Sequence, residues 1–229
     1  FISGAASLDN TIEKRYRLLG INLVQGYGLT ETSPVVAIGT NKNYKLGSIG
    51  KTVPSVEAKL VDVNEEGIGE LVVRGPSIML GYYENEEANK ESLKEGWFYT
   101  GDLAKIDEEG YIFICGRKKS VIVLKNGKNI FPEELENLVN KIEGVKEAFI
   151  FGKAQSDDKN RDFIKDVYKV EKNEDIYTVL AKKIKEINQT MPSYKAIRGI
   201  MLTEEPLIRT TTNKIKRQEN LDAIRKLKD

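Results

Sequence analysis

The sequence predicts a protein of mixed α/β and α+β class in two parts: a strand–helix–strand unit running into a β-rich region, then a small α+β module. Three observations support this. Residues 1–45 have the strand–helix–strand pattern, residues 46–117 alternate apolar and polar side chains between turns, and residues 118–229 alternate strand and helix segments. The pattern changes at residues 117–120, which is where we place the domain boundary.

The first unit begins with a strand end at residues 1–3 and continues with an amphipathic helix at residues 8–19, which stops at Gly20. The apolar side of this helix consists of Ile12, Tyr16 and Leu19. A second strand is predicted at residues 21–24, followed by a glycine-rich loop. Because a helix connects the two strands, we expect them to be parallel, with ligand loops at their carboxyl ends.

The β-rich region is predicted to contain two hairpins and one surface helix. The first hairpin pairs residues 56–60 with residues 70–74 across an Asn-Glu-Glu-Gly turn at residues 64–67. The second turns at residues 107–110. The charged segment at residues 84–94 is predicted to be a helix on the surface.

The second part is a module of about 110 residues, within the usual range for a domain. Pro132 suits the first turn of a helix, and apolar residues follow it at helical spacing. Helices are predicted at residues 132–142, 176–187 and 216–228, and strands at residues 148–151, 163–170 and 200–202.

The composition excludes several classes of protein. A net charge of +1 gives no reason to expect nucleic-acid binding, and the absence of histidine excludes Ser-His and Cys-His catalysis. Cys115 is the only cysteine, so no intrachain disulfide is expected. We interpret it as a buried structural thiol in a reducing, cytoplasmic compartment. No apolar run is long enough to span a bilayer, which leaves peripheral membrane contact open.

A glycine-rich run follows the second predicted strand and carries side chains suited to a nucleotide. Gly26 and Gly28 let the backbone approach a ligand closely. Tyr27 can cover a purine face, and Thr30 can bond a phosphate oxygen. Glu31 can hold Mg²⁺ that bridges phosphates. On its own, the Gly-Tyr-Gly sequence is more typical of an ordinary glycine-rich turn after a strand.

Two further positions carry groups that can bind a nucleotide. Asp102 follows Gly101 in a predicted turn, and a carboxylate there can hold two vicinal ribose hydroxyls. Arg117 follows an apolar strand and offers a planar fork of donors for ribose or phosphate oxygens. The alternatives are an acidic turn residue and a surface charge cluster in which Lys118 is only solvated.

Two loops in the second module can bring positive charge to a site. Lys125 precedes an Asn-Gly pair at residues 126–127, which is the strongest short signal for a hairpin turn. Lys214 follows a Thr-rich loop and Asn213, a residue that tolerates positive φ. Read without the other motifs, these are a plain β-turn and a loop before a basic helix.

The order, spacing and flanks of these motifs resemble those of adenylate-forming (AMP-binding) enzymes. The resemblance rests on residues 96–136, supported by residues 3–31 and 209–217, and is greatest to the bacterial long-chain fatty acyl-CoA synthetases. It implies that residues 1–117 are the C-terminal portion of a large AMP-binding domain, whose preceding part is missing. Residues 118–229 would be the small mobile C-terminal domain.

The resemblance assigns roles to individual residues. The nucleotide-binding residues would be Gly4, Ala5, Gly26, Tyr27, Gly28, Thr30, Asp102 and Arg117. Among them, Tyr27 would meet the adenine and Asp102 the ribose, while Glu31 would hold Mg²⁺. Lys119 would be the hinge, and Lys125 and Gly127 would lie near CoA. Lys214 would be catalytic and stabilise charge that develops between the carboxylate and the α-phosphate.

The implied function is that of an acid–thiol ligase. A fatty acid and ATP would give acyl-AMP and pyrophosphate, and CoA would then displace AMP. The family's Ser/Thr/Gly-rich phosphate loop lies upstream and has no match in this chain, so we expect the chain alone to be inactive. Two alternatives stay open: a non-catalytic truncated paralogue that binds AMP or a partner protein, and acyl transfer to a carrier-protein thiol.

Overall fold

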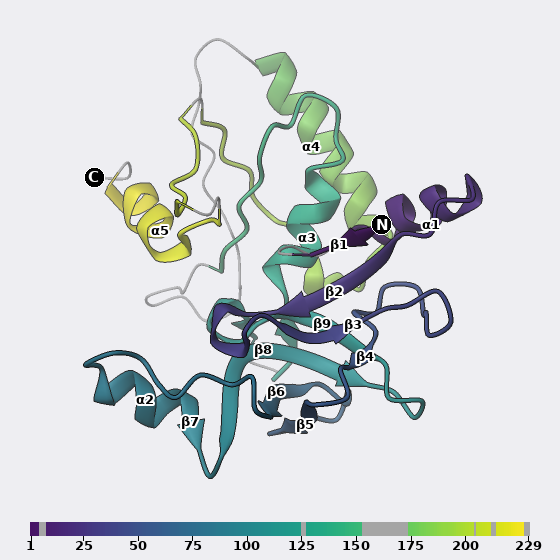
Figure 1. Ribbon diagram of the computed structural model, residues 1–229. Helices are drawn as coiled ribbons and strands as arrows, with labels where there is room; N and C mark the ends of the chain where they lie inside the picture. Colours follow the sequence, from purple (N-terminus) through teal and green to yellow (C-terminus); the bar gives the residue numbers. More distant parts are fainter. Residues whose placement is uncertain (5–7, 125–126, 153–173, 204, 212–213, 227–229) are drawn as a thin grey trace. The chain divides into compact units, whose positions relative to one another are not determined.

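The chain forms two compact units in the computed structural model, residues Phe1–Lys119 and Ser120–Asp229 (Figure 1). The structure describes residues 1–4, 8–124, 127–152, 174–203, 205–211 and 214–226. Each unit is treated by itself below. The division between them falls directly after Lys119, inside the one-turn 3₁₀ helix η2 (Lys118–Ser120).

The first unit opens with a sheet of strands β1 (Ile2–Ser3), β2 (Val24–Gly28), β3 (Val35–Ile38) and β4 (Lys51–Thr52), in that order (Figure 1). Strands β1 and β2 are parallel, as predicted, and the other pairs are antiparallel. The second strand was predicted too early, since the glycine-rich run lies within β2. Gly26 and Tyr27 have ladder partners on β3, which makes this run part of the sheet.

Helix α1 (Asn10–Leu18) connects β1 to β2. Asp9 caps it by accepting the backbone N–H groups of Thr11 and Ile12 at 2.9 and 3.2 Å. Ile12, Tyr16 and Leu19, which were predicted to form the apolar side of this helix, are 45%, 45% and 76% exposed. The helix instead buries Glu13, whose carboxylate accepts the Gln25 side chain at 3.1 Å.

The second sheet is antiparallel and packs with residues of β3 in the core of the first unit. Its strands are β5 (Glu57–Val61), β6 (Gly69–Arg74), β8 (Trp97–Ile106) and β7 (Leu93–Lys94), in that order, with β9 (Ile112–Arg117) beside β8. Helix α2 (Glu86–Ser92) precedes β7. The core side chains include Leu71, Val73, Phe98, Ala104 and Ile112. Cys115 on β9 is half-buried, not fully buried as predicted.

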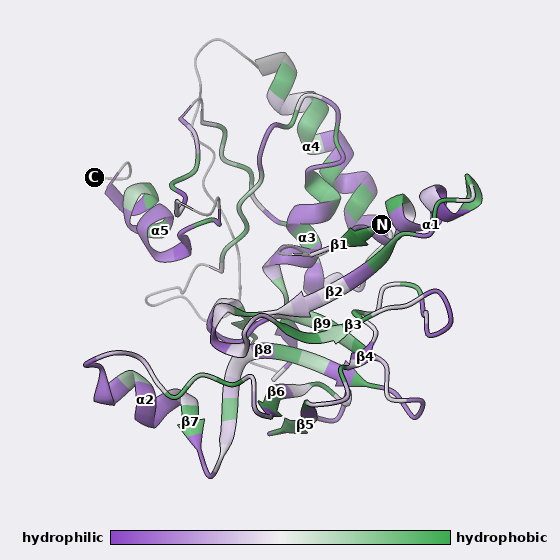
Figure 2. Ribbon diagram, in the orientation of Figure 1, coloured by the Kyte–Doolittle hydropathy of each residue, from purple (hydrophilic) through white to green (hydrophobic). Residues whose placement is uncertain are grey.

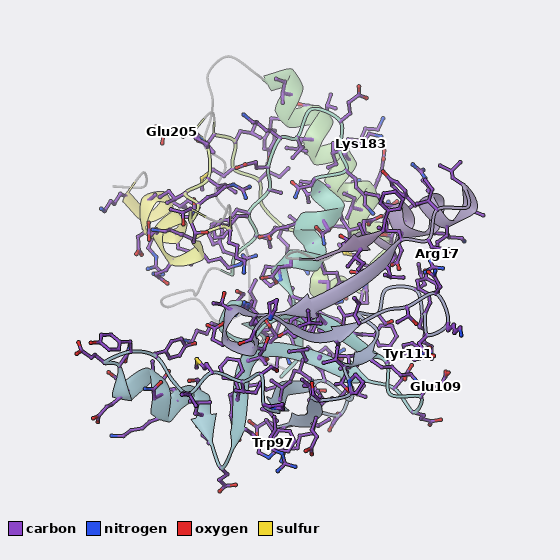
Figure 3. All side chains as sticks on the ribbon, in the orientation of Figure 1. Arg17, Trp97, Glu109, Tyr111, Lys183 and Glu205 are labelled. Atoms are coloured by element: carbon purple, nitrogen blue, oxygen red, sulfur yellow. The ribbon has the colours of Figure 1, made fainter. Side chains whose placement is uncertain are left out.

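The predicted turn at residues 107–110 is confirmed as the hairpin between β8 and β9. The backbone N–H of Asp107 donates to the Tyr111 carbonyl at 3.0 Å. Lys45 Nζ lies 2.5 Å from the Asp107 carboxylate and 2.8 Å from that of Glu109. Glu109 and Tyr111 are labelled at this end of the sheet in Figure 3. The ion pairs tie this hairpin to the loop between β3 and β4, which contains Lys45.

Among its described residues, the second unit contains a short hairpin and three α-helices. Strands β10 (Ile122–Val123) and β11 (Asn129–Ile130) are antiparallel, and the helices are α3 (Pro132–Val139), α4 (Glu174–Gln189) and α5 (Arg217–Lys226). Pro132 is the first helical residue, as predicted. Figure 2 shows hydrophobic and hydrophilic residues alternating along α4, whose Leu180 and Ile184 enter the core of this unit.

Two strands predicted in this unit are wrong. Within the part of the chain that the structure describes, residues 148–151 and 200–202 join no ladder. The reason is visible at Ile150, whose backbone N–H donates to the buried Glu136 carboxylate at 2.7 Å instead of to a neighbouring strand. The strand predicted at 163–170 lies outside the described residues. No described helix is long and apolar enough to cross a bilayer.

Candidate active site

Three of the predicted nucleotide-binding residues meet around one buried carboxylate. The Asp102 side chain on β8 is 6% exposed and lies 2.9 Å from Nε of Arg117, which is its register partner on β9. The hydroxyl of Tyr27 on β2 donates to the other carboxylate oxygen of Asp102 at 2.5 Å. The structure therefore brings an aromatic ring, a carboxylate and a guanidinium together from both sheets of the first unit.

Asp102 does not lie in a turn, so that prediction is wrong. It lies within β8, at a bulge where the pairing with β6 passes from Leu103 directly to Tyr99. Gly101 takes φ +71° there, a conformation that favours glycine. The Thr100 hydroxyl donates to the Leu71 carbonyl at 2.7 Å and accepts the Asp102 N–H at 3.1 Å. Bulges re-aim side chains, and this one directs Asp102 towards Tyr27.

Burial raises the pKa of Tyr27, and the negative charge of Asp102 together with their hydrogen bond raises it further. The hydroxyl therefore stays protonated and remains a donor to Asp102 across the neutral range. Tyr27 is half-buried, so its ring retains an exposed part. This hydrogen bond fixes the orientation of the Tyr27 ring.

Replacement of Tyr27 by phenylalanine should change how stability depends on pH. The folded-state pKa of Tyr27 is above its ordinary value of about 10, so its contribution is complete below pH 10 and is lost as the pH rises through the folded pKa. Above pH 10, the wild-type free energy of unfolding should fall faster than that of Tyr27→Phe, by up to about 1.4 kcal/mol per pH unit.

Urea unfolding between pH 8 and 11 measures this difference. The matched control is Tyr83→Phe, since Tyr83 is 90% exposed. Parallel pH profiles for the wild type and Tyr27→Phe would contradict the assignment of a raised pKa to Tyr27.

Thr30 and Glu31 lie in the short helix η1 (Thr30–Thr32), directly after β2. The Glu31 carboxylate accepts the Tyr82 hydroxyl at 2.9 Å, and its backbone carbonyl accepts the Met79 N–H at 2.8 Å. Thr32, which the sequence reading missed, is fully buried and bonds the Pro34 carbonyl at 2.9 Å. It holds the turn that presents Thr30 and Glu31.

The residues present fit a magnesium ion that is shared with a ligand. Among the described residues, no three acidic, cysteine or histidine side chains form a cluster that could hold a metal alone. Glu31 supplies one half-buried carboxylate. Mg²⁺ is usually held by one or two carboxylates together with substrate phosphates, so a single glutamate suits this mode of binding.

Lys118 was predicted to be only solvated, and this is wrong. Its Nζ lies 2.6 Å from the carboxylate of Glu70, whose side chain is 6% exposed, and this hydrogen bond raises the pKa of Lys118. Glu70 also accepts the Gly101 N–H at 3.2 Å. A buried glutamate needs a hydrogen-bonding or charged partner. The position of Glu70 in an otherwise apolar segment of the sequence could therefore have indicated such a pair. Lys119, the predicted hinge, follows directly and is exposed.

The surroundings of Gly28 leave no space for a side chain, whereas those of Gly4 do. A Cβ on Gly28 would lie 1.5 Å from the Pro34 carbonyl oxygen, so only glycine fits there. A Cβ on Gly4 would lie 3.5 Å from the Gly26 carbonyl oxygen, which is ordinary contact. Packing thus explains Gly28 without a ligand. Ala5 lies outside the described residues.

The predicted turn at residues 126–127 is supported by its flanks in the second unit. Gly127 has φ +77° and donates its N–H to the Leu124 carbonyl at 2.9 Å. The N–H of Leu124 in turn donates to the Lys128 carbonyl at 2.9 Å. Lys125 and Asn126 lie outside the described residues.

Lys214 lies at the end of a small hairpin in the second unit. Arg209 and Ile215 form an antiparallel bridge, and the Thr210 N–H donates to the Lys214 carbonyl at 2.8 Å. The Lys214 N–H donates to the Thr210 hydroxyl at 3.1 Å. The residue itself is exposed. Hydrogen bonds thus hold the backbone of this exposed residue.

Two known protein families match this chain. Residues 1–83 match the family described as AMP-binding enzyme, and residues 119–226 match the AMP-binding enzyme C-terminal domain. A long-chain-fatty-acid–CoA ligase of Salmonella typhimurium is 42% identical over 156 residues, which cover 65% of this chain and 28% of that protein. A 2-succinylbenzoate–CoA ligase of Oceanobacillus iheyensis is 35% identical over 153 residues, or 32% of its length.

Solved structures give the same grouping. The O-succinylbenzoate coenzyme A synthetase of Bacillus subtilis in complex with AMP has a TM-score of 0.75 and 27% identity, over 95% of this chain and 44% of that one. An anthranilate CoA ligase in complex with anthranoyl-AMP has a TM-score of 0.73 and 26% identity, over 97% of this chain and 44% of that one. The chain thus spans less than half of these relatives, and it belongs to the adenylate-forming AMP-binding enzymes.

Proposed function

We propose that this chain is the C-terminal part of an ATP-dependent acid–thiol ligase that forms acyl-CoA through an acyl-adenylate, with a long-chain fatty acid as substrate. The observation that carries the proposal is the contact of Tyr27 and Arg117 with the buried Asp102 carboxylate. The long-chain assignment rests on the 42% identity to the Salmonella typhimurium ligase.

The residues of the first unit would bind the nucleotide. Asp102, which pairs with Arg117, would accept both ribose hydroxyls. Tyr27, fixed through its hydroxyl, would cover the adenine with its ring. Thr30 would bond the α-phosphate. Glu31 would hold Mg²⁺, which neutralises phosphate charge when it is bound.

Different residues of the second unit would act in the two successive half-reactions. Lys214 would stabilise the charge that develops as a carboxylate oxygen attacks the α-phosphorus and pyrophosphate leaves. The CoA thiol would then attack the acyl carbon and displace AMP. In that step, we propose that the loop of Lys125 and Gly127 lies near CoA. Lys119 would be the hinge between the two orientations, since a hinge concentrates the dihedral change in a few residues.

The test is a panel of carboxylates assayed on the proposed full-length ligase, with pyrophosphate release as the readout. We expect long-chain fatty acids to give the highest kcat/KM, and 2-succinylbenzoate and anthranilate to give low values. A preference for an aromatic acid would overturn the substrate assignment but keep the ligase. Thioester formation with CoA and with a carrier protein decides the acceptor.

The same assay on the 229-residue chain alone decides whether it is active by itself. We expect no turnover, because the β- and γ-phosphates would lack their upstream loop. Turnover comparable to the full-length ligase would contradict this. AMP binding by a full-length protein that releases no pyrophosphate with any carboxylate would favour a non-catalytic AMP-binding protein.

A further inference from the structure

We infer that Arg217 is a positioning residue for Lys214, and that its ion pair with Glu136 sets where the Lys214 hairpin presents its ammonium group. This inference rests on the proposed function, because it gives that reaction a residue that acts through Lys214. The four observations that carry it all lie within the second unit.

The first observation is the environment of Glu136. Its side chain projects from α3 and is only 8% exposed. One carboxylate oxygen accepts the Ile150 N–H at 2.7 Å, and the other lies 2.7 Å from Nη2 of Arg217. Nη1 of Arg217 donates to the Ile150 carbonyl at 3.2 Å. Glu136 and Arg217 thus bridge α3, the segment around Ile150 and the start of α5.

The second observation is the place of Arg217 in the chain, three residues after Lys214. Between them, the Lys216 N–H donates to the Ile208 carbonyl at 2.9 Å and closes the base of the hairpin. A shift of Arg217 would therefore reach Lys214 through one short segment whose backbone is hydrogen-bonded at Lys214 and Lys216.

The third observation is a buried amide at the base of the hairpin. The Asn220 side chain on α5 accepts the Ile208 N–H at 2.9 Å. It also donates to the carbonyls of Ile208 and Lys216 at 2.9 and 2.8 Å. Asn220 is 4% exposed, so α5 and both arms of the hairpin form one hydrogen-bonded unit.

The fourth observation is a second ion pair on the other arm. Nη2 of Arg209 lies 2.8 Å from the Glu147 carboxylate, which also accepts the Leu207 N–H at 3.2 Å. The base of the hairpin is thus held on both arms, while Lys214 is exposed beyond it. Such an arrangement would fix the backbone from which the flexible Lys214 side chain extends.

A catalytic lysine needs a fixed backbone because its charge lies at the end of a flexible four-carbon side chain. Small displacements of a catalytic group are expensive in rate: about 1 Å can slow a reaction about 100-fold. Charge-assisted, two-pronged arginine contacts fix geometry better than single ones, which suits Arg217 to this task. The competing explanation is that the pair only stabilises the second unit, and the two explanations predict different kinetics.

The kinetic test uses the proposed full-length ligase and separates its two half-reactions. In Arg217→Gln, we expect kcat for acyl-AMP formation to fall about tenfold with the KM for ATP unchanged, as for a misplaced catalytic group. Thioester formation from supplied acyl-AMP and CoA, which does not use Lys214, should change less than about twofold. Arg217→Lys keeps the charge but not the fork, and should restore part of the rate.

Two controls make the result specific. Arg225→Gln removes another arginine of α5 that is 72% exposed, and it should leave both half-reactions unchanged. In a Lys214→Met background, Arg217→Gln should have no further effect on acyl-AMP formation, because a residue that acts through Lys214 cannot act without it. Equal losses in both half-reactions, or full additivity with Lys214→Met, would overturn the inference.

A further measurement tests the anchoring of the hairpin and does not depend on enzymatic activity. Hydrogen exchange of the Thr210 and Lys216 amides in the 229-residue chain should be faster in Arg217→Gln than in Arg225→Gln. Unchanged exchange would overturn the anchoring itself. If the full-length protein releases no pyrophosphate, the proposed function fails first, and exchange still decides whether Arg217 holds the hairpin.

Discussion

Replacement of Lys214 by methionine is expected to slow acyl-AMP formation by about 10²- to 10³-fold, the usual effect of removing one preorganised electrostatic stabiliser of a transition state. Methionine keeps the length and apolar volume of the stem but removes the charge. The hairpin should stay intact, since Lys214 takes part in it through its backbone N–H and carbonyl.

The measurement is single-turnover formation of acyl-AMP by the proposed full-length ligase, beside thioester formation from supplied acyl-AMP. Only the first should fall, because the charge of Lys214 is needed only where the α-phosphate reacts. The matched control is Lys216→Met, two residues away, whose ammonium group pairs with Glu219 at 2.7 Å on the surface. Equal rates for Lys214→Met and Lys216→Met would exclude the catalytic role of Lys214.

The second large effect is expected from Asp102→Asn, which should weaken AMP binding about 10- to 100-fold. Hydrogen bonds to a charged group are worth about 1.5–3 kcal/mol, and about 1.4 kcal/mol corresponds to a factor of ten in affinity. The asparagine has nearly the same shape, but it loses the charge that pairs with Arg117 at 2.9 Å. It also turns one of the two acceptors into a donor.

Titration calorimetry of AMP into the proposed full-length ligase measures the change. Asp107→Asn is the matched control, since Asp107 lies in the hairpin after the same strand β8 and pairs with Lys45. It should bind AMP like the wild type. If Asp102→Asn also binds AMP normally, the ribose assignment is wrong, and the Asp102 cluster has only a structural role.

The local features of the fold could be predicted because they depend on near neighbours in the chain. The parallel pairing of β1 with β2 follows from the helix between them, and the turns at residues 64–67 and 107–110 follow from Asn, Asp and Gly. Pro132 begins α3 as predicted because its fixed φ suits the first helical turn.

The predictions that failed depended on distant partners. Ile150 was expected in a strand, but its N–H bonds to Glu136, which lies 14 residues earlier. Asp102 was expected in a turn, but the long strand β8 absorbs Gly101 as part of a bulge. Lys118 was expected in solvent, but it neutralises Glu70 on β6, 48 residues away. Local propensity contains no information about these partners.

For the site, the chemical groups and their approximate places along the chain could be read from the residues alone: a glycine-flanked tyrosine, an acid, an arginine and a lysine. Folding brings Tyr27 and Asp102, 75 residues apart, into one hydrogen bond, and pairs Glu136 with Arg217 across 81 residues. Such contacts cannot be read from local sequence because they are set by strand register and burial. These make a carboxylate hidden from water take whichever donors the fold brings to it.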